Sequence, residues 1–533
     1  MRTPPRRSGA ALALTLAVLA PLATVSAAPA NATGAAAQAR PASTVAWQPC
    51  EAQPKADCAS VSVPLDWDSP TGPKIAIAIA RVKAADPAQR IGTLLVDPGG
   101  PGGSGVGYVQ DTLDPKDPSF SAALHRRFDI VGFDPRGVGA SREIRCAKDL
   151  VEAEVDLRPD SQAEYDAIVR HNRLLGNDCR RHNGRLLGHI DTASVVRDMD
   201  AIRAALGESK VSYYGVSYGT QIGQQYAELF GGRLRALVLD SNVDHSLDAR
   251  EYLRTSDIDF EGATGAFAAW CDRTRECALH GRGAFRVWRA LLARAKAGTL
   301  RDVATDTLVD TERLRSTTFG AMYSPSHAKR GWFGLATTLR HWADATARPV
   351  NPPQDEKPGD GLESNTYQPI WCSDWRWRQA DDYRSLRRAM AYGARFAPRT
   401  EGSLYYSDIT TCAGWPVRVS NPQHRLSVKD GPARILVTAS AFDPPTPRGW
   451  SLNVARQLPG SVFLTYEGVG HGDYYLSPCA QQAIDRYLIS LATPAPGTRC
   501  PAVWPTAGTT SRTGPPALGY PFDAVTRGPG RTG

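Results

Sequence analysis

Short apolar segments recur along the first half of the chain and have the spacing of β-strands. Residues 60–65 are β-like, and in residues 74–82 three isoleucines alternate with alanines, which predicts a half-buried strand. Residues 93–96 and 128–133 are mainly apolar runs, and each leads into glycine-rich sequence. Such runs are typical of strands that are buried on both faces of a parallel sheet.

Segments with helical periodicity separate the later strands. Apolar residues recur at helical spacing between residues 195 and 206, and Gly207 follows as a C-terminal cap. A strand at 211–216, a turn, a helix through about residue 230 and a strand at 236–239 come next. This alternation of strand and helix predicts an open α/β sheet.

The alternation stops at about residue 246 and resumes with apolar strands at 435–438 and 462–466. The intervening sequence is rich in aromatic and charged residues, which predicts an inserted, largely helical cap domain. Its Trp-dense run at 371–377 either lines a subsite or fills the core of the cap. The predicted organisation is a signal peptide (1–30), a flexible leader (31–45), a first core part (46–245), the cap insertion (246–425), a second core part (426–500) and a Pro/Gly-rich tail (501–533).

The N-terminus has the features of an export signal. Arg2, Arg6 and Arg7 precede an apolar run over residues 10–20, which is too short to span a bilayer. Small residues follow at 26–30 and provide cleavage sites for a signal peptidase. We therefore expect a secreted protein without stable membrane insertion.

Ten cysteines fit an exported protein, because an even number in an oxidising compartment favours disulfides. Their order suggests pairs between neighbours, such as Cys50 with Cys58 and Cys271 with Cys277, while the sequence alone leaves the connectivity open. The sequence has no CxxC or HExxH motif, so we expect neither a metal nor a cofactor. The net charge of +8 comes without a dense Lys/Arg run, which argues against a nucleic-acid partner.

The segment Gly215-Val216-Ser217-Tyr218-Gly219 contains the pattern G-x-S-x-G. In the α/β-hydrolase fold this pattern is the nucleophile elbow, a sharp strand-to-helix turn that exposes the serine hydroxyl. The glycines permit close approach of strand and helix, and the helix N-terminus favours negative charge beside the serine. Because an apolar strand precedes the motif and a helical pattern follows it, the sequence predicts Ser217 as a catalytic nucleophile.

A serine nucleophile needs a base, and the base needs an orienting carboxylate. In this fold they follow the serine in the order Asp or Glu, then His. Only His424 and His471 lie near the second half of the sheet, and only His471 directly follows an apolar strand. Asp443 follows the preceding strand, whereas Asp473 lies after the histidine. We therefore expect a triad of Ser217, Asp443 and His471.

The oxyanion that forms during acyl transfer needs hydrogen-bond donors. We expect one donor to be the backbone N–H of Tyr218, the residue after the nucleophile. The other should come from the glycine-rich loop at 97–105, where the backbone can approach the substrate closely. Gly100 is the preferred donor and Gly99 the alternative. The loop lacks the GK[ST] ending of a phosphate-binding loop.

These motifs together resemble the secreted bacterial tripeptidyl aminopeptidases, α/β-hydrolase serine peptidases that are related to the prolyl aminopeptidases. The motifs are the GGPGG loop at 99–103, FDPRGVGAS at 133–141, the GVSYG elbow, DPPTP at 443–447 and GHG at 470–472. The resemblance covers about residues 45–500 and implies an exopeptidase with a cap domain and the same three triad residues. Pro98 stands where the prolyl enzymes have the histidine of HGGPG, so the chain departs from that branch.

An aminopeptidase must bind the free α-ammonium group of its peptide, normally with buried carboxylates. The sequence does not decide which carboxylates these are; the candidates are Asp257, Asp259, Glu261 and Asp374. We expect Arg136 to brace loops beside the site. The expected substrates are peptides with a free N-terminus, from which tripeptides or short N-terminal units are released. The alternative is a secreted esterase with the same triad, and a third possibility, an inactive binding protein, is disfavoured by the intact triad.

Overall fold

The computed structural model describes residues 45–114, 119–153, 155–302, 305, 307–345, 361–432 and 434–508. The predicted signal peptide lies outside these residues, as do residues 31–44 of the predicted leader and 509–533 of the predicted tail. The described part of the tail, 501–508, forms neither helix nor strand. None of the helices in the described ranges combines the length and apolar character that a membrane span needs.

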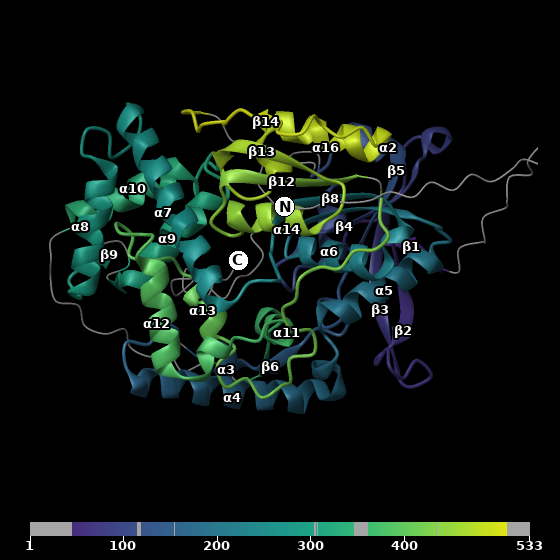
Figure 1. The fold of residues 1–533 in the computed structure, drawn as a ribbon, viewed down its shortest axis with the longest axis horizontal. Coiled ribbons are helices and arrows are strands. Elements are labelled where there is room, and N and C mark those ends of the chain that lie inside the picture. Colours follow the sequence, from purple (N-terminus) through teal and green to yellow (C-terminus); the bar gives the residue numbers. More distant parts are fainter. Residues whose placement is uncertain are drawn as a thin grey trace, which may run out of the picture. The chain divides into compact units, whose positions relative to one another are not determined.

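A ten-stranded sheet forms the centre of the described chain (Figure 1). Its strands, from one edge to the other, are β1 (Gln48–Pro49), β2 (Asp57–Pro64), β3 (Lys74–Val82), β5 (Phe128–Phe133), β4 (Gly92–Asp97), β7 (Val211–Ser217), β8 (Leu234–Asn242), β12 (Ile435–Phe442), β13 (Ser461–Val469) and β14 (Arg499–Cys500). The pairing is parallel from β5 across to β14 and antiparallel from β1 to β5. The predicted, mostly parallel α/β sheet is confirmed.

Helices cover both faces of the sheet (Figure 1). One face carries α1 (Gly105–Asp111), α2 (Ala122–Arg127) and α16 (Pro478–Ser490), and the other carries α5 (Thr192–Ala205), α6 (Gly219–Phe230) and α14 (Arg448–Gln457). In β4, Leu94 and Val96 belong to the core under the first group, and Leu95 belongs to the core under the second. This burial on both faces explains why the strand reads as one apolar run.

A largely helical layer is formed by the chain between β8 and β12. Its elements are α7 (Ala249–Arg273), α8 (Ala284–Lys296), β9 (Arg301–Asp302), β10 (Thr307–Leu308), α9 (Thr311–Tyr323), α10 (Trp332–Asp344), β11 (Leu362–Ser364), α11 (Tyr367–Asp374), α12 (Tyr383–Ala394) and α13 (Tyr406–Thr410). The other short elements are α15 (Asp473–Leu476) and the 3-10 helices η1 (Pro87–Gln89), η2 (Gly184–Gly188), η3 (Gly231–Arg233) and η4 (Arg378–Asp381). The cap boundaries at 246 and 425 stay a prediction.

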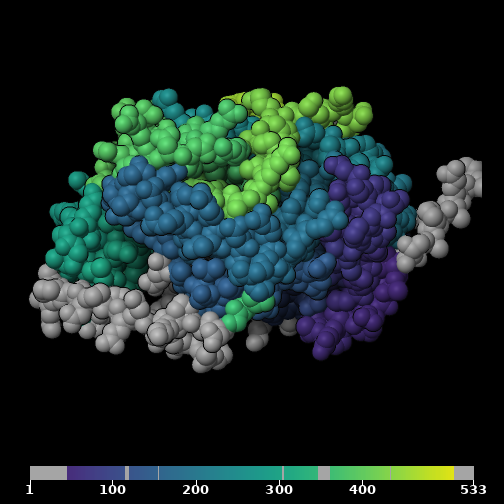
Figure 2. Space-filling view, turned by 90° about the horizontal axis from the view of Figure 1, so that it is seen from below, coloured from purple at the N-terminus to yellow at the C-terminus, as the bar shows by residue number. Residues whose placement is uncertain are grey.

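A segment from the first half of the chain lies against this layer. It contains β6 (Arg145–Ala147), α3 (Lys148–Val151) and α4 (Gln162–Asn183). Strand β6 pairs antiparallel with β11, and Asn172 of α4 donates to the carbonyls of Thr410 and Ala413 at 2.9 and 2.8 Å. In Figures 1 and 2 the blue segment with α4 lies beside green segments of the second half. The sequence pattern did not predict this pairing of distant segments.

The Trp-dense run lies in the core of the helical layer. The rings of Trp371 and Trp375 stack with centroids 4.7 Å apart, and those of Trp375 and Trp377 do the same. Tyr252 of α7 contacts all three rings and stacks on Trp450 of α14 at 4.6 Å. All five side chains are buried. Of the two interpretations that the sequence left open, the structure supports the core.

Disulfides join cysteines that are neighbours in sequence order. Both suggested pairs are formed, Cys50–Cys58 and Cys271–Cys277. The others are Cys146–Cys179, Cys372–Cys412 and Cys479–Cys500. The Cys146–Cys179 bridge joins β6 to α4, and Cys372–Cys412 closes a 40-residue separation within the helical layer. The predicted disulfides are thus confirmed.

Candidate active site

Ser217 ends β7 at the centre of the sheet, and α6 begins two residues later, at Gly219. Its φ of +60° lies in the left-handed region, which a non-glycine residue adopts only where the surrounding structure enforces it. A Cβ added to Gly215 would lie 2.4 Å from the carbonyl oxygen of Gly219. Only glycine allows strand and helix to approach this closely, so the motif produces the sharp turn that presents the serine.

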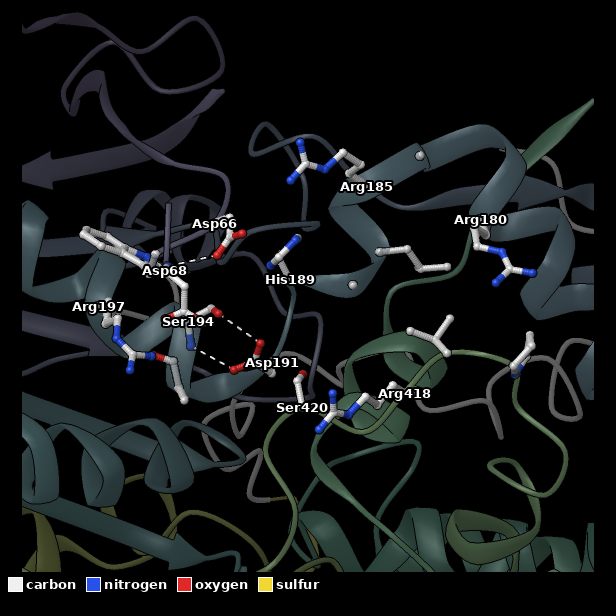
Figure 3. A pocket seen from close by; sticks show the side chains of 17 residues that line it. Asp66, Asp68, Arg180, Arg185, His189, Asp191, Ser194, Arg197, Arg418 and Ser420 are labelled. Atoms are coloured by element: carbon white, nitrogen blue, oxygen red, sulfur yellow. Dashed lines mark hydrogen bonds between the residues drawn. The ribbon is translucent and has the colours of Figure 1, made fainter. Parts of the chain in front are cut away.

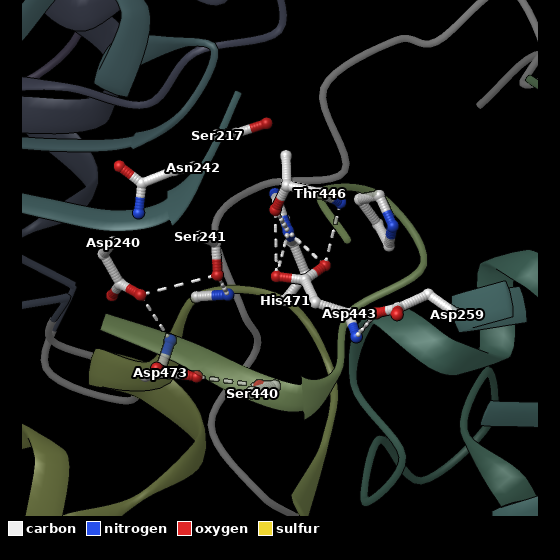
Figure 4. Close-up of polar contacts among 12 residues, drawn as sticks. Ser217, Asp240, Ser241, Asn242, Asp259, Ser440, Asp443, Thr446, His471 and Asp473 are labelled. Carbon is white, nitrogen blue, oxygen red and sulfur yellow. Dashed lines mark hydrogen bonds and ion pairs between the residues drawn. The ribbon is translucent and has the colours of Figure 1, made fainter. Parts of the chain in front are cut away.

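His471 and Asp443 follow the neighbouring strands β13 and β12 (Figure 4). His471 Nδ1 lies 2.9 Å from Asp443 Oδ1 and 3.2 Å from Oδ2, and both side chains are buried. When Nδ1 donates its proton to the carboxylate, Nε2 becomes the hydrogen-bond acceptor of the neutral imidazole. Figure 4 draws no hydrogen bond from Ser217 to His471, and such contacts commonly tighten only in the substrate complex.

The carboxylate of Asp443 is held in place by its own loop and by the helical layer. Thr446 donates its backbone N–H to Oδ1 at 3.1 Å and its hydroxyl to Oδ2 at 2.9 Å. Asp259 of α7 accepts the backbone N–H groups of Asp443 and Arg448 at 3.0 and 3.1 Å. Burial, together with the charge of Asp443, raises the pKa of Asp259 to about 7. Asp259, suggested by the sequence as an amine ligand, therefore braces the acid loop.

The loop that carries His471 is anchored to the end of β8. Ser241 Oγ accepts the Gly472 N–H at 2.8 Å, and the Asp240 carboxylate accepts the N–H groups of Asp473 and Tyr474 at 2.8 and 3.0 Å. Burial raises the pKa of Asp240 above its usual value, although the hydrogen bonds from these backbone donors offset part of the shift. Sequence reasoning missed Asp240; its position after the strand at 236–239 was the available signal.

Asp473 and His424, the alternatives to the expected acid and base, form hydrogen bonds with other residues. Asp473 accepts a hydrogen bond from Ser440 Oγ at 2.7 Å, and burial with the nearby Asp240 raises its pKa well above the usual range. His424 Nε2 lies 2.9 Å from Glu228 Oε2, and this contact raises the pKa of His424. Both side chains thus have structural partners away from Ser217.

The glycine-rich loop after β4 packs against the elbow. Gly99 donates its N–H to Asp97 Oδ1 at 2.8 Å, and a Cβ added to Gly99 would lie 2.7 Å from the backbone nitrogen of Tyr218. Burial raises the pKa of Asp97 to about 7. The N–H groups of Gly100 and Tyr218 are not donated to any other described backbone or side chain. Of the two glycines, Gly100 therefore has the available donor.

The helical layer also reaches the histidine. His471 donates its backbone N–H to the carbonyl of Tyr323, the last residue of α9, at 3.0 Å. The two rings contact edge to face with centroids 5.2 Å apart. No sequence motif pointed to Tyr323, because its contact depends on how α9 docks.

Comparison with known proteins assigns the chain to a family. Residues 398–500 match the family described as TAP-like protein. Over 501 residues the chain is 32% identical to serine protease Hip1 of Mycobacterium tuberculosis, which covers 86% of this chain and 91% of that protein. It is 31% identical over 476 residues to the tripeptidyl aminopeptidase of Streptomyces lividans, covering 85% of this chain and 86% of the relative. The chain belongs to the tripeptidyl aminopeptidase family.

Membership of the tripeptidyl aminopeptidase family identifies an enzyme, a hydrolase of the α/β-hydrolase fold, and confirms the resemblance found in the sequence. Carboxylesterase B of Mycobacterium tuberculosis is also similar, at 33% identity over 470 residues that cover 84% of this chain and 86% of that protein. Relatives of this chain thus carry both peptidase and esterase names.

In this tripeptidyl aminopeptidase family member, two further carboxylates suggested as amine ligands stabilise the helical layer. Asp257 Oδ1 accepts the backbone N–H of Ser403 at 2.7 Å, and burial raises the pKa of Asp257 to about 6. Glu261 pairs with Arg399 and accepts the backbone N–H of Thr400 at 2.9 Å. Both carboxylates fix the chain that follows α12.

Arg136 braces loops beside the sheet, as the sequence suggested. Its buried guanidinium donates to Asp198 at 2.7 and 2.6 Å and to the carbonyls of Leu65 and His189, each at 2.8 Å. None of these partners belongs to the predicted triad. Arg136 therefore joins the end of β2 to the middle of α5 and to the turn that precedes this helix.

A separate pocket of about 820 Å³ lies at the start of α5 (Figure 3). Its walls come from the turn after β2, the end of α4 and residues 416–420, and they carry Arg180, Arg185, Arg197 and Arg418. None of Ser217, Asp443 and His471 lines it. This pocket is therefore distinct from the candidate active site of the tripeptidyl aminopeptidase family member.

Proposed function

We propose that the protein is a secreted serine aminopeptidase in which Ser217, His471 and Asp443 form the catalytic triad. The single observation that carries the proposal is the 2.9 Å contact between His471 Nδ1 and Asp443 Oδ1, beside a serine held at a φ of +60°. The relatives named serine protease Hip1 and tripeptidyl aminopeptidase support peptides as the substrates.

The first half-reaction forms an acyl-enzyme. His471 Nε2 takes the proton of Ser217 Oγ as this oxygen bonds to the carbonyl carbon of the scissile peptide bond. The carbonyl oxygen receives the electron pair and becomes an oxyanion. When the intermediate collapses, the C–N bond breaks and His471 returns the proton to the leaving amine. The Asp443 carboxylate stabilises the imidazolium that exists between these two transfers.

The second half-reaction releases the N-terminal fragment. Water takes the position of the departed amine, and His471 removes one of its protons as the water oxygen attacks the acyl carbon. The bond from the acyl carbon to Ser217 Oγ then breaks, and His471 returns the proton to the serine. The product is a short peptide with a new carboxylate, and the enzyme is regenerated.

The proposed oxyanion donors are the backbone N–H groups of Tyr218 and Gly100. Support comes from the loop contacts, since Gly99 uses its own N–H on Asp97 and leaves that of Gly100 available. The N-terminus of α6 adds the positive end of its helix dipole. A donor of this kind contributes about 3–4 kcal/mol to transition-state stabilisation in well-studied enzymes.

We also infer that the protein is exported and that it removes short N-terminal units from its peptide substrates. The basic and apolar pattern of residues 1–30 supports a cleaved signal peptide, and the disulfides suit an oxidising compartment. The tripeptide unit follows the name of the Streptomyces relative. The inference of export is tested by sequencing the N-terminus of the mature protein from culture medium. We expect this N-terminus to follow a cleavage among the small residues at 26–30.

A substrate panel tests the activity. Tripeptide and longer amides with free N-termini, the same peptides acetylated at the N-terminus, and simple acyl esters are offered at equal concentration, and products are weighed by mass spectrometry. We expect cleavage of the free peptides with tripeptide products. Ser217→Ala should lose activity by at least about 10³-fold. Ser256→Ala is the matched control, because this buried hydroxyl only bonds back to Tyr252 in its own helix.

The similarity to carboxylesterase B favours an esterase as the second candidate. Both functions use the same acyl-enzyme and differ in what the site admits. Turnover of esters without cleavage of any free peptide would select the esterase and overturn the aminopeptidase. Cleavage confined to acetylated peptides would also contradict the proposed exopeptidase.

A further inference from the structure

Behind the nucleophile elbow, the side chain of Tyr218 ends in a buried polar cluster. Its hydroxyl donates to Asp374 Oδ2 and lies 2.6 Å from Thr192 Oγ1. Tyr218 is 4% exposed, Thr192 1% and Asp374 0%, so this cluster is shielded from solvent. The residue after the proposed nucleophile is therefore held at both its backbone and its phenol.

The Asp374 carboxylate is the centre of this cluster. It accepts the backbone N–H of Thr192 at 3.0 Å and the side-chain amides of Asn421 and Gln221 at 2.7 and 3.1 Å. The Thr192 hydroxyl donates to it as well. All these donors, like the Tyr218 phenol, are neutral. The Thr192 N–H and the Asn421 amide donate to Oδ1, and the two hydroxyls and the Gln221 amide donate to Oδ2. Gln221 Oε1 is buried without a hydrogen-bond partner, but every donor named above reaches the carboxylate, and these bonds favour a single arrangement of the Tyr218 phenol.

The cluster joins parts of the chain that are far apart in sequence. Asp374 ends α11 in the helical layer, Thr192 begins α5 on the sheet, and Gln221 lies in the first turn of α6. Tyr218 is the point at which these elements meet the elbow. Its position is therefore set by the helical layer as well as by β7.

The backbone of Tyr218 has little freedom once its phenol is fixed. A Cβ added to Gly99 would lie 2.7 Å from the Tyr218 nitrogen, so the glycine-rich loop packs directly on this peptide unit. Two torsions, χ1 and χ2, separate the backbone from the ring plane. Removing the hydroxyl's partners would release the ring and, with it, the direction of the N–H.

We propose that Asp374 is a positioning residue that holds the Tyr218 N–H toward the oxyanion through the Tyr218 phenol. The proposal rests on the proposed function, since it needs the oxyanion to form beside Ser217. It assigns Asp374, suggested by the sequence as an amine ligand, to alignment of the elbow. It also gives the helical layer a direct part in the rate of acyl transfer.

Tyr218→Phe tests this role by removing one oxygen and keeping the ring. We expect kcat to fall about 10- to 100-fold and KM to stay within about twofold, because alignment of an oxyanion donor acts in the transition state. Binding of a peptide boronate, which forms a tetrahedral adduct with the serine, should weaken by a similar factor. Tyr165→Phe is the matched control, since its buried hydroxyl donates to the Ala380 carbonyl at 2.6 Å, away from the elbow.

Asp374→Asn supplies the second arm. Its amide would place an NH₂ against the donors that now meet a carboxylate oxygen, so we expect the same kcat loss. If Asp374 acts through the phenol, the double variant should lose no more activity than Asp374→Asn alone.

A folded Tyr218→Phe enzyme with wild-type kcat would overturn the inference, as would a change confined to KM or losses that add in the double variant. Activity that survives in Ser217→Ala would instead overturn the proposed function. The two failures are therefore distinguishable in one set of proteins.

Discussion

Replacement of Asp443 by Asn changes the chemistry of the triad while keeping the shape of the side chain. In the native loop the carboxylate accepts Thr446 N–H at Oδ1, the Thr446 hydroxyl at Oδ2, and His471 Nδ1 at 2.9 Å. An amide can keep its oxygen on the Thr446 N–H, but its NH₂ then faces the imidazole at the 3.2 Å position now held by Oδ2. The NH₂ at this position favours the tautomer in which His471 Nδ1 accepts and Nε2 carries the proton, so that Nε2 cannot act as a base. It competes with the tautomer in which Nδ1 still donates to the amide oxygen at 2.9 Å. The neutral amide also no longer stabilises the imidazolium.

The magnitude follows from this tautomer change. A triad locked in the wrong tautomer loses about 10⁴-fold in kcat, which corresponds to about 5 kcal/mol of transition-state stabilisation. The assay is steady-state hydrolysis of a preferred free peptide by Asp443→Asn, with the melting temperature measured alongside. Thr446→Val is the matched control, because it removes one donor to Asp443 and leaves the carboxylate, and we expect a loss of only about tenfold. A stable Asp443→Asn enzyme within tenfold of wild-type kcat would refute the reasoning.

Three further predictions concern the scaffold. Gly99→Ala should lower the melting temperature and the activity far more than Gly497→Ala. Both glycines have a positive φ (+86° and +78°), but only at Gly99 would the added Cβ lie 2.6 Å from a carbonyl oxygen of the elbow. Equal effects of the two substitutions in a thermal melt would contradict this. Burial raises the pKa of Asp259 to about 7 from 3.8, so its ionised form is disfavoured in the folded protein. As the pH rises from about 4 to 7, the free energy of unfolding of the wild type should therefore fall relative to that of Asp259→Asn. The slope in urea unfolding should be at most about 1.4 kcal/mol per pH unit, and a rise over that range would have the wrong sign. Joint replacement of Cys372 and Cys412 by Ala opens a 40-residue separation and should cost about 4 kcal/mol in urea unfolding, whereas an unchanged midpoint would show that the bridge is not formed.

The sheet could be predicted from the sequence because each strand carries its own local signal. The isoleucine alternation at 74–82 coincides with β3, and the helical spacing before Gly207 corresponds to α5, Thr192–Ala205. The packing of α4 on the helical layer could not be predicted, because the pairing of β6 with β11 joins residues more than 200 positions apart. No local pattern specifies such a pairing.

The candidate site, too, could be predicted from the sequence only in part. Ser217 has a short motif, and His471 and Asp443 could be proposed from their order after apolar strands. These three assignments stay predictions until they are tested. The residues that brace them could not be found this way, since Asp259 reaches the acid loop from α7 and Asp374 reaches Tyr218 from α11. Their roles depend on docking between segments, which the sequence does not reveal.

Covalent labelling of the proposed nucleophile tests the central claim most directly. The mature protein is treated with a fluorophosphonate, digested, and mapped by mass spectrometry while peptidase activity is followed. We predict one adduct, on Ser217, whose formation parallels the loss of activity, and no adduct in Ser217→Ala. Full inactivation with the adduct on another residue, or retention of activity in a protein fully labelled at Ser217, would contradict the proposed mechanism.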